Sequence, residues 1–252
     1  MDNTRSDEAK ALNRMRAVTI SREYGSGGGE IASRLARRLG WHLVDHEAVI
    51  RMAQDLGVSE EEAEAHDERT EGVLASFLRT VQGMEPSLYA NAPEEAFTNM
   101  QDYHAAMRRI LAAAIREGHV VIVGRGSQVA LRERRDVLHA RIVASTEQRV
   151  PYIMRREGVD EGTARKRIST KDHDRQRYLQ ANYNHEPADA HLYDLTINTD
   201  VLDLDAATDL IYVALHHKAT RLTLPPEELG PGAGLTRYPA SPEDFSQMSQ
   251  PE

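Results

Sequence analysis

Apolar side chains recur along the chain with two spacings, one typical of buried strands and one typical of helices. Residues 17–21 form a short apolar run, and Ile31, Leu35 and Leu39 then fall on one face of a helix predicted over 29–39. The same patterns predict strands at 41–44, 119–124, 137–145 and 192–199, and helices at 94–117, 164–183 and 203–217. Strands that alternate with helices predict an α/β fold with a parallel sheet and right-handed crossovers.

Local signals mark the ends of two helices. Gly118 follows the helix predicted over 94–117 as its C-cap. Ser145 and Gln148 form a capping box that opens another helix, and Pro151 falls near the first turn of that helix. Both signals support helices that connect successive strands.

The pattern also divides the chain into regions. Residues 1–16 are polar and read as a flexible lead, and 17–218 carry the strands and helices of one domain. Within it, 46–117 is long enough to form a helical lobe over one edge of the sheet. Residues 219–252 hold six of the ten prolines, which predicts a disordered tail.

Composition excludes several classes of protein. A net charge of −9 argues against a general nucleic-acid binder, which would carry a basic surplus. No apolar stretch approaches the roughly 20 residues that span a membrane, and the N-terminal residues lack a signal-peptide core. The absence of cysteine fits a cytoplasmic protein. These features predict a protein that binds neither nucleic acid nor membranes; the oligomeric state stays open.

A cluster of glycines follows the first predicted strand. In "VTISREYGSGGGEI" the loop leads directly into the helix at 29–39, which is where backbone N–H groups can converge on a phosphate. The pattern G-x-x-x-x-G-K-[ST] is absent. With Gly27 as its second glycine, Arg22 stands at the first glycine, Gly28 at the lysine and Gly29 at the Ser/Thr. A plain tight turn remains an alternative, and a working site would need its cations from elsewhere.

Charged residues at the ends of other strands are candidates for that role. Asp45 follows the strand at 41–44, and Arg125 follows the strand at 119–124, at the sheet edge where ligands bind in open α/β folds. Arg149 and Arg156 lie seven residues apart on one helix face, with Arg155 beside them. Arg175 and Arg177 lie in the next predicted helix. A lone arginine is more often a surface residue, but this grouping favours an anion site.

Metal binding is not predicted. His42, His46 and His66 have spacings that fit no usual zinc site, and no cysteine is available. We therefore expect these histidines to lie on the surface or in the core.

Several motifs occur together in a characteristic order: "ITISREYGSGG-EIA", "VIVGRG", "ASTEQRV--I-RREG", "DHDRQRYL--NY" and "LYDLTINT". From about Ala17 to His217 they resemble the cytidylate kinase-like family, a divergent branch of the P-loop nucleoside monophosphate kinases. Loops of the form "SR-YGSGG" without lysine are usual in that branch. The resemblance makes damage a poorer explanation for the missing lysine.

The resemblance implies a fold and a set of roles. The fold is a P-loop nucleoside-kinase-like three-layer α/β/α arrangement with a parallel central sheet, a helical monophosphate-binding lobe (46–117) and a lid (146–180). The substrates are ATP, with Mg²⁺ as its cofactor, and a nucleoside monophosphate; no protein ligand to the metal is assigned. The Asn198–Thr199 turn would lie towards the adenine. ATP would contact Arg22, Gly25, Ser26, Gly27, Gly28, Gly29, Glu30 and Arg155; the acceptor, Asp45 and Arg125; and the transferring phosphoryl group, Arg149, Arg156, Arg175 and Arg177.

Three departures leave alternatives open. Gly29 stands where relatives in this branch often have arginine, Gly126 replaces an aspartate of ordinary cytidylate kinases, and Glu30 replaces their threonine. The leading hypothesis is phosphoryl transfer from ATP to a nucleoside monophosphate, with cytidylate (CMP or dCMP) as the first guess. The alternatives are a nucleotide-binding regulatory protein without turnover, and a kinase of the same fold that acts on another small acceptor.

Overall fold

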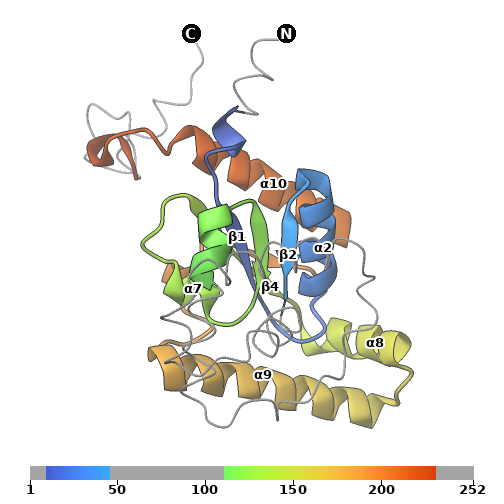
Figure 1. Ribbon diagram of the computed structural model, residues 1–252. Helices are drawn as coiled ribbons and strands as arrows, with labels where there is room; N and C mark the ends of the chain where they lie inside the picture. Colours follow the sequence, from blue (N-terminus) through green and yellow to red (C-terminus); the bar gives the residue numbers. More distant parts are fainter. Residues whose placement is uncertain (1–9, 46–110, 231–252) are drawn as a thin grey trace, which may run out of the picture.

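The computed structural model describes residues 10–45 and 111–230, which form a parallel sheet with helices around it (Figure 1). Most of the predicted lobe, residues 46–110, and the tail beyond 230 lie outside the described residues. The five strands run in the order β2-β3-β1-β4-β5. They are β1 (Ala17–Arg22), β2 (His42–Val44), β3 (Val120–Val123), β4 (Val137–Val143) and β5 (Leu195–Asn198).

Strand β1 lies at the centre of the sheet. Its Ala17 pairs with Val120 of β3 on one side and with Val137 of β4 on the other, and both pairings are parallel. All the strands therefore end at the same edge, where the glycine loop follows β1, Asp45 follows β2 and Arg125 follows β3.

Two helices cover one face of the sheet. Helix α2 (Gly28–Leu39) and helix α10 (Leu204–Thr220) bury Ile31, Leu35 and Ile211 completely against alternate side chains of the central strands. The helical spacing of these apolar residues explains why this face forms the main core.

The opposite face carries buried polar groups. Thr19 and Ser21 of β1 point away from α2, as do His139 and Arg141 of β4, because side chains alternate along a strand. These residues bond to one another: Thr19 Oγ1 lies 2.7 Å from His139 Nδ1, and Arg141 Nη1 lies 3.4 Å from Ser21 Oγ. The short helix α7 (Ser127–Ala130) follows β3 near this face.

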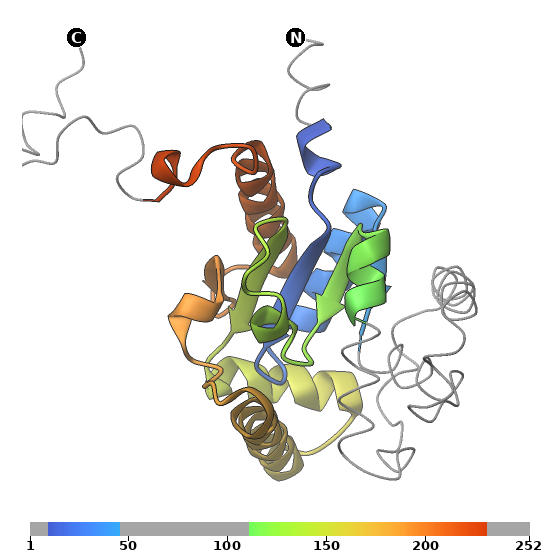
Figure 2. The ribbon, with the colours of Figure 1, turned by 60° about the vertical axis from the view of Figure 1, so that its left-hand side comes forward.

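Helices α8 (Thr146–Glu157) and α9 (Glu161–Tyr183) lie across the carboxyl ends of the strands (Figures 1 and 2). The Ser145 side chain accepts a hydrogen bond from the Gln148 N–H, as the capping box predicted, and Asp160 caps α9 in the same way through Thr163 N–H. Val150 and Ile153 of α8 pack on Ala164 and Ile168 of α9. The two helices therefore form a hairpin at the edge where the glycine loop lies.

Most predicted elements in the described residues are confirmed, although several of their ends differ and the short helix α7 was not predicted. Pro151 lies in the second turn of α8 rather than the first. The last strand is shorter than 192–199, because the 3-10 turn η3 (Ala190–Leu192) takes up its beginning. Helix α10 continues beyond 217 to Thr220, Ala219 is fully buried, and a second 3-10 turn η4 (Pro226–Glu228) follows. No helix among the described residues is long and apolar enough to cross a membrane.

Candidate phosphate-binding site

The glycine loop connects β1 to α2. Gly25 and Gly27 adopt left-handed backbone angles, with φ of 84° and 80°, which favour glycine. Ser26 Oγ donates to the Glu23 carbonyl at 2.9 Å, and Thr199 Oγ1 donates to the Ser26 carbonyl at 3.0 Å. These bonds fix the loop from two sides.

The first turn of α2 has no side-chain cap. Its N-cap residue is Gly27, which makes no capping hydrogen bond through a side chain. The backbone N–H groups at this end and the positive end of the helix dipole are therefore suited to an anion.

The Arg22 side chain folds back over this turn. A Cβ atom on Gly28 would lie 2.7 Å from Arg22 Cβ, and a Cβ atom on Gly29 would lie 2.5 Å from Arg22 Nη1. Real Cβ contacts are essentially never shorter than 3.0 Å. The two glycines are thus the positions that leave room for the arginine.

Asp172 of α9 joins the helical hairpin to the loop. Its Oδ1 accepts a hydrogen bond from Tyr24 N–H at 2.7 Å, and its carboxylate pairs with Arg149 and with Arg175, the latter at 3.4 Å. Arg149 Nη1 also donates to the Tyr24 carbonyl at 3.2 Å. Two of the predicted catalytic arginines are therefore held against the loop backbone.

Arg156, near the C-terminal end of α8, contacts the helix that follows the glycine loop. It forms an ion pair with Glu30 in the first turn of α2, and its Nη1 donates to Tyr152 Oη at 2.8 Å. The sequence predicts that Glu30 helps to hold phosphate, and in this structure its carboxylate pairs with Arg156 of α8.

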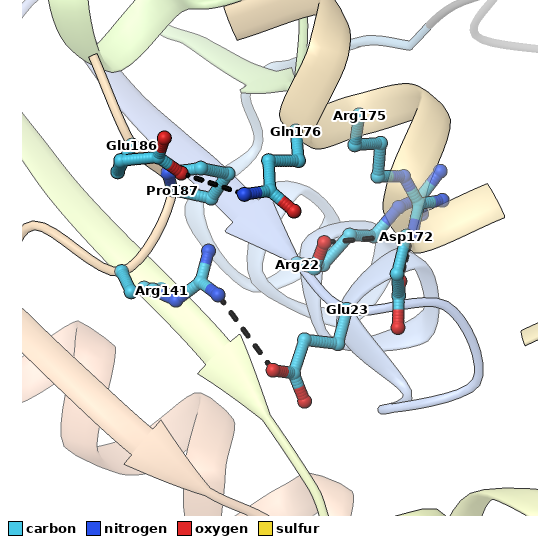
Figure 3. A pocket seen from close by; sticks show the side chains of 9 residues that line it. Arg22, Glu23, Arg141, Asp172, Arg175, Gln176, Glu186 and Pro187 are labelled. Carbon is cyan, nitrogen blue, oxygen red and sulfur yellow. Dashed lines mark hydrogen bonds and ion pairs between the residues drawn. The ribbon is translucent and has the colours of Figure 1, made fainter. Parts of the chain in front are cut away.

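A pocket of about 190 Å³ opens beside the loop (Figure 3). Glu23 is one of its lining residues, with Oε1 at 3.7 Å from Arg141 Nη2 and Oε2 accepting from Ala144 N–H at 3.1 Å. Gln176 of α9 donates to Glu186 at 2.9 Å across the pocket wall. The lining residues are Arg22, Glu23, Arg141, Asp172, Arg175, Gln176, Glu186, Pro187 and Ala188.

Arg125 occupies a tight turn after β3. Gly124, Arg125 and Gly126 all have positive φ, between 62° and 74°, which is uncommon for a side chain as large as arginine. A Cβ atom on Gly126 would overlap the ring of Tyr183 at the end of α9. Gly126 is therefore explained by the packing of Tyr183, and Asp45 follows β2 on the neighbouring strand.

The guanidinium groups around the loop act on one another. Loss of water on burial is the main cause that lowers the pKa of Arg22, and it lowers the pKa of Arg125 and of Arg175 to about 10. Repulsion from Arg22 contributes to the lowered pKa of Arg125 and of Arg175, while Asp45 raises the pKa of Arg22 and of Arg125. Partly desolvated cations that repel one another are stabilised by a bound anion.

Two predicted site residues lie outside this group of arginines around the loop. Arg155 and Arg177 are exposed, and Arg177 lies two residues from Arg175, hence on another side of α9. Conversely, the sequence-based prediction missed Glu23, Arg141 and Asp172. Arg141 could have been found as the one arginine within the apolar strand pattern at 137–145, and Asp172 as a carboxylate three residues before Arg175.

Protein ligands for a metal are scarce among the described residues. They contain no group of three or more His, Asp or Glu side chains that could hold a metal ion. Gly29 supplies no hydroxyl at the position where the usual loop has serine or threonine.

A sequence comparison establishes the family of this chain. The sequence model of the cytidylate kinase-like family matches residues 17–201. The chain belongs to the cytidylate kinase-like family. Membership places it among kinase-like proteins with a P-loop fold, and it confirms the resemblance that the motifs indicated.

One solved structure supports the fold of this cytidylate kinase-like protein. A crystal structure of an uncharacterized protein from Eubacterium ventriosum superposes with a TM-score of 0.59 at 23% identity, and covers 79% of this chain and 98% of that chain. Shikimate kinase from Acinetobacter baumannii in complex with shikimate matches with a TM-score of 0.43 at 12% identity, over 85% of this chain and 99% of that chain. No curated protein matches the chain in sequence. The first superposition supports the fold alone.

Proposed function

We propose that this protein transfers a phosphoryl group from ATP to a nucleoside monophosphate, with cytidylate (CMP or dCMP) as the first acceptor to test. The observation that carries the proposal is the convergence of Arg149 and Arg175, through Asp172, on the backbone of the glycine loop. An uncapped helix end supports phosphate binding, and the adjacent arginines support stabilisation of charge on a transferring group.

The glycine positions favour turnover over a protein that has lost it. Gly28, Gly29 and Gly126 look like losses of functional side chains in the sequence alone. Each of them instead accommodates a neighbouring side chain, Arg22 or Tyr183. The regulatory alternative therefore loses the observation on which it rested.

The proposed roles follow from the geometry. In phosphoryl transfer, negative charge spreads over the phosphoryl oxygens, so fixed cations supply most of the catalysis. Asp172 holds Arg149 and Glu30 holds Arg156 beside the loop, where their remaining N–H groups would donate to phosphate oxygens of ATP. Arg125 would orient the acceptor phosphate, with Asp45 beside it. Arg155 remains a predicted ATP contact and Arg177 a predicted catalytic residue, both from outside this cluster.

Magnesium would enter with ATP. It neutralises charge on the β- and γ-phosphates, and it commonly keeps phosphate oxygens and water as most of its ligands. Gly29 offers no hydroxyl as a ligand, which fits that mode of binding.

A second candidate is a kinase of the same fold that acts on another small acceptor. The pocket beside Arg22 combines arginines with the carboxylates of Glu23, Asp172 and Glu186. Carboxylates accept hydrogen bonds from hydroxyl or amino groups, so this lining suits an acceptor that offers such groups as well as an anion.

A coupled assay that measures ADP formation distinguishes these functions. The protein with Mg-ATP is offered CMP, dCMP, UMP, AMP and GMP, and separately a panel of phosphorylatable sugars and hydroxy acids. ADP formation that depends on a monophosphate supports the proposal. Activity only with a non-nucleotide acceptor favours the second candidate, and ATP binding without any turnover favours a regulatory protein.

A further inference from the structure

We propose that Arg22 contacts the phosphates of ATP in place of the missing loop lysine, because the cation and the glycine have exchanged positions within the motif. The inference rests on the proposed function, since it assigns a residue to the phosphates of the ATP site. It concerns the pair of positions that carry glycine and lysine in the ordinary pattern.

The exchange follows from the distance between the two positions. The pattern G-x-x-x-x-G-K places glycine first and lysine seventh, and here Arg22 stands first and Gly28 seventh. A Cβ atom at 28 would approach Arg22 Cβ to 2.7 Å. Only one of these two positions can carry a side chain, whichever of them holds the cation.

Gly29 completes the arrangement. The Arg22 side chain extends from Gly28 to Gly29, where its Nη1 lies 2.5 Å from the place of an absent Cβ. The guanidinium therefore lies against the first turn of α2. A side chain at 29 would displace this group, although it would contact only the mobile end of the arginine.

The position of the guanidinium points to an anion. The amino end of a helix carries partial positive charge, so a cation there is repelled. The Asp45 carboxylate attracts the Arg22 guanidinium. The ion pairs of the site in the described residues join Arg141, Arg149, Arg156 and Arg175 to carboxylates, however, and none of them includes Arg22. A phosphate between the guanidinium and the backbone N–H groups would satisfy both.

Polyphosphate is the class of ligand that fits. Arginine presents a planar fork that can bind two oxygens of one phosphate or bridge two phosphates, whereas lysine offers one compact charge. We therefore expect Arg22 to contact the phosphate chain of a nucleoside di- or triphosphate rather than the base.

Calorimetric titration with Mg-ADP and with inorganic tripolyphosphate tests the exchange. Arg22→Ala should weaken both ligands about 10- to 100-fold, as expected for a lost charge-assisted hydrogen bond. The reciprocal variant Arg22→Gly/Gly28→Lys should bind more tightly than Arg22→Gly, because it restores the ordinary order. Arg38→Ala, at the far end of α2, is the matched control and should leave affinity unchanged.

Gly29→Ala provides an independent variant that keeps the arginine. It should fold normally, by circular dichroism and thermal melting, and weaken both ligands by displacing the guanidinium. In the Arg22→Ala background the same change should have little further effect, since the two act through one group.

The outcomes separate this inference from the proposed function. Wild-type protein that binds neither ligand would overturn both. Wild-type binding that Arg22→Ala and Gly29→Ala leave unchanged would overturn only the role of Arg22. Weakening by both variants, with non-additive effects, supports the exchange.

Discussion

Asp172 Oδ1 on α9 accepts a hydrogen bond from the backbone N–H of Tyr24 at 2.7 Å, so the hairpin of α8 and α9 is bonded directly to the glycine loop. The same carboxylate pairs with Arg149, which itself donates to the Tyr24 carbonyl. The loop backbone and a proposed catalytic arginine are thus positioned by one side chain that the sequence did not single out.

Replacing Asp172 should therefore impair activity through position as well as charge. Asp172→Ala removes both the Tyr24 bond and the ion pair, and we expect it to lower kcat/KM at least about 10-fold and the free energy of unfolding by about 1–3 kcal/mol. Asp172→Asn can still accept from Tyr24, so it should retain more stability than Asp172→Ala. Steady-state kinetics and urea denaturation measure the two effects, and equal stability of the two variants would contradict the bond to Tyr24.

Arg149 is predicted to act mainly in catalysis. It is buried, it contacts the loop, and it would stabilise charge on the transferring group, so Arg149→Ala should lower kcat by about 100-fold or more. Arg165→Ala is the control, since Arg165 is an exposed residue of the same hairpin that pairs only with Glu161 in the described residues. Similar losses in the two variants would show that general charge, rather than position, explains the effect.

The order of strands and helices was predictable because it depends on local patterns. The apolar runs gave β1, β3 and β4, the spacing of Ile31 and Leu35 gave α2, and capping residues placed the start of α8 within one residue. Each of these signals lies within a few neighbouring positions.

The site was less predictable because its contacts join distant parts of the chain. Asp172 meets Tyr24 across 148 residues, and Arg141 meets Glu23 only because β1 and β4 are neighbours in the sheet. The glycines at 28, 29 and 126 looked like missing functions, since nothing local indicates that Arg22 or Tyr183 fills the space. The sequence identifies each of these residues, but it does not show which distant residues they contact in the fold.

Two nearby glycines allow the packing at Tyr183 to be tested. Gly124 and Gly126 both have positive φ, but a Cβ atom at 124 would meet nothing within 4 Å, whereas at 126 it would overlap the Tyr183 ring. Gly124→Ala should cost only backbone strain, about 1–2 kcal/mol. Gly126→Ala should cost about 1–3 kcal/mol more because of the overlap.

Thermal or urea unfolding of both variants measures this difference. Replacing Tyr183 with alanine in the Gly126→Ala background should remove most of the excess cost, because the two residues are then no longer in contact. Equal destabilisation by Gly124→Ala and Gly126→Ala would show that Tyr183 does not explain Gly126.

His139 predicts a loss of stability in mild acid. The pKa of His139 is lowered to about 4, mainly by burial and partly by the Lys218 ammonium. This value is below the roughly 6.5 expected for an unfolded chain. The folded protein therefore binds fewer protons than the unfolded chain between these values, and its stability falls as pH drops from about 6.5 towards 4. From this residue alone we expect a loss on the order of 2 kcal/mol between about pH 7 and pH 5.

Urea denaturation at the two pH values compares wild type with His139→Gln. The variant keeps a polar side chain near Thr19 but has no titrating group, so its stability should decline less steeply. A decline as steep as that of the wild type would show that other groups account for the acid sensitivity.

The central claim is that a loop without lysine supports phosphoryl transfer, and the fate of the γ-phosphate of ATP tests it most directly. Wild-type protein is incubated with CMP and ATP that is radiolabelled in its γ-phosphate, and the products are separated by thin-layer chromatography, with Arg149→Ala in parallel. We expect labelled CDP from the wild type and about 100-fold less from the variant. Label that remains in ATP or appears only as inorganic phosphate, with CMP and with each of the other monophosphates, would contradict it.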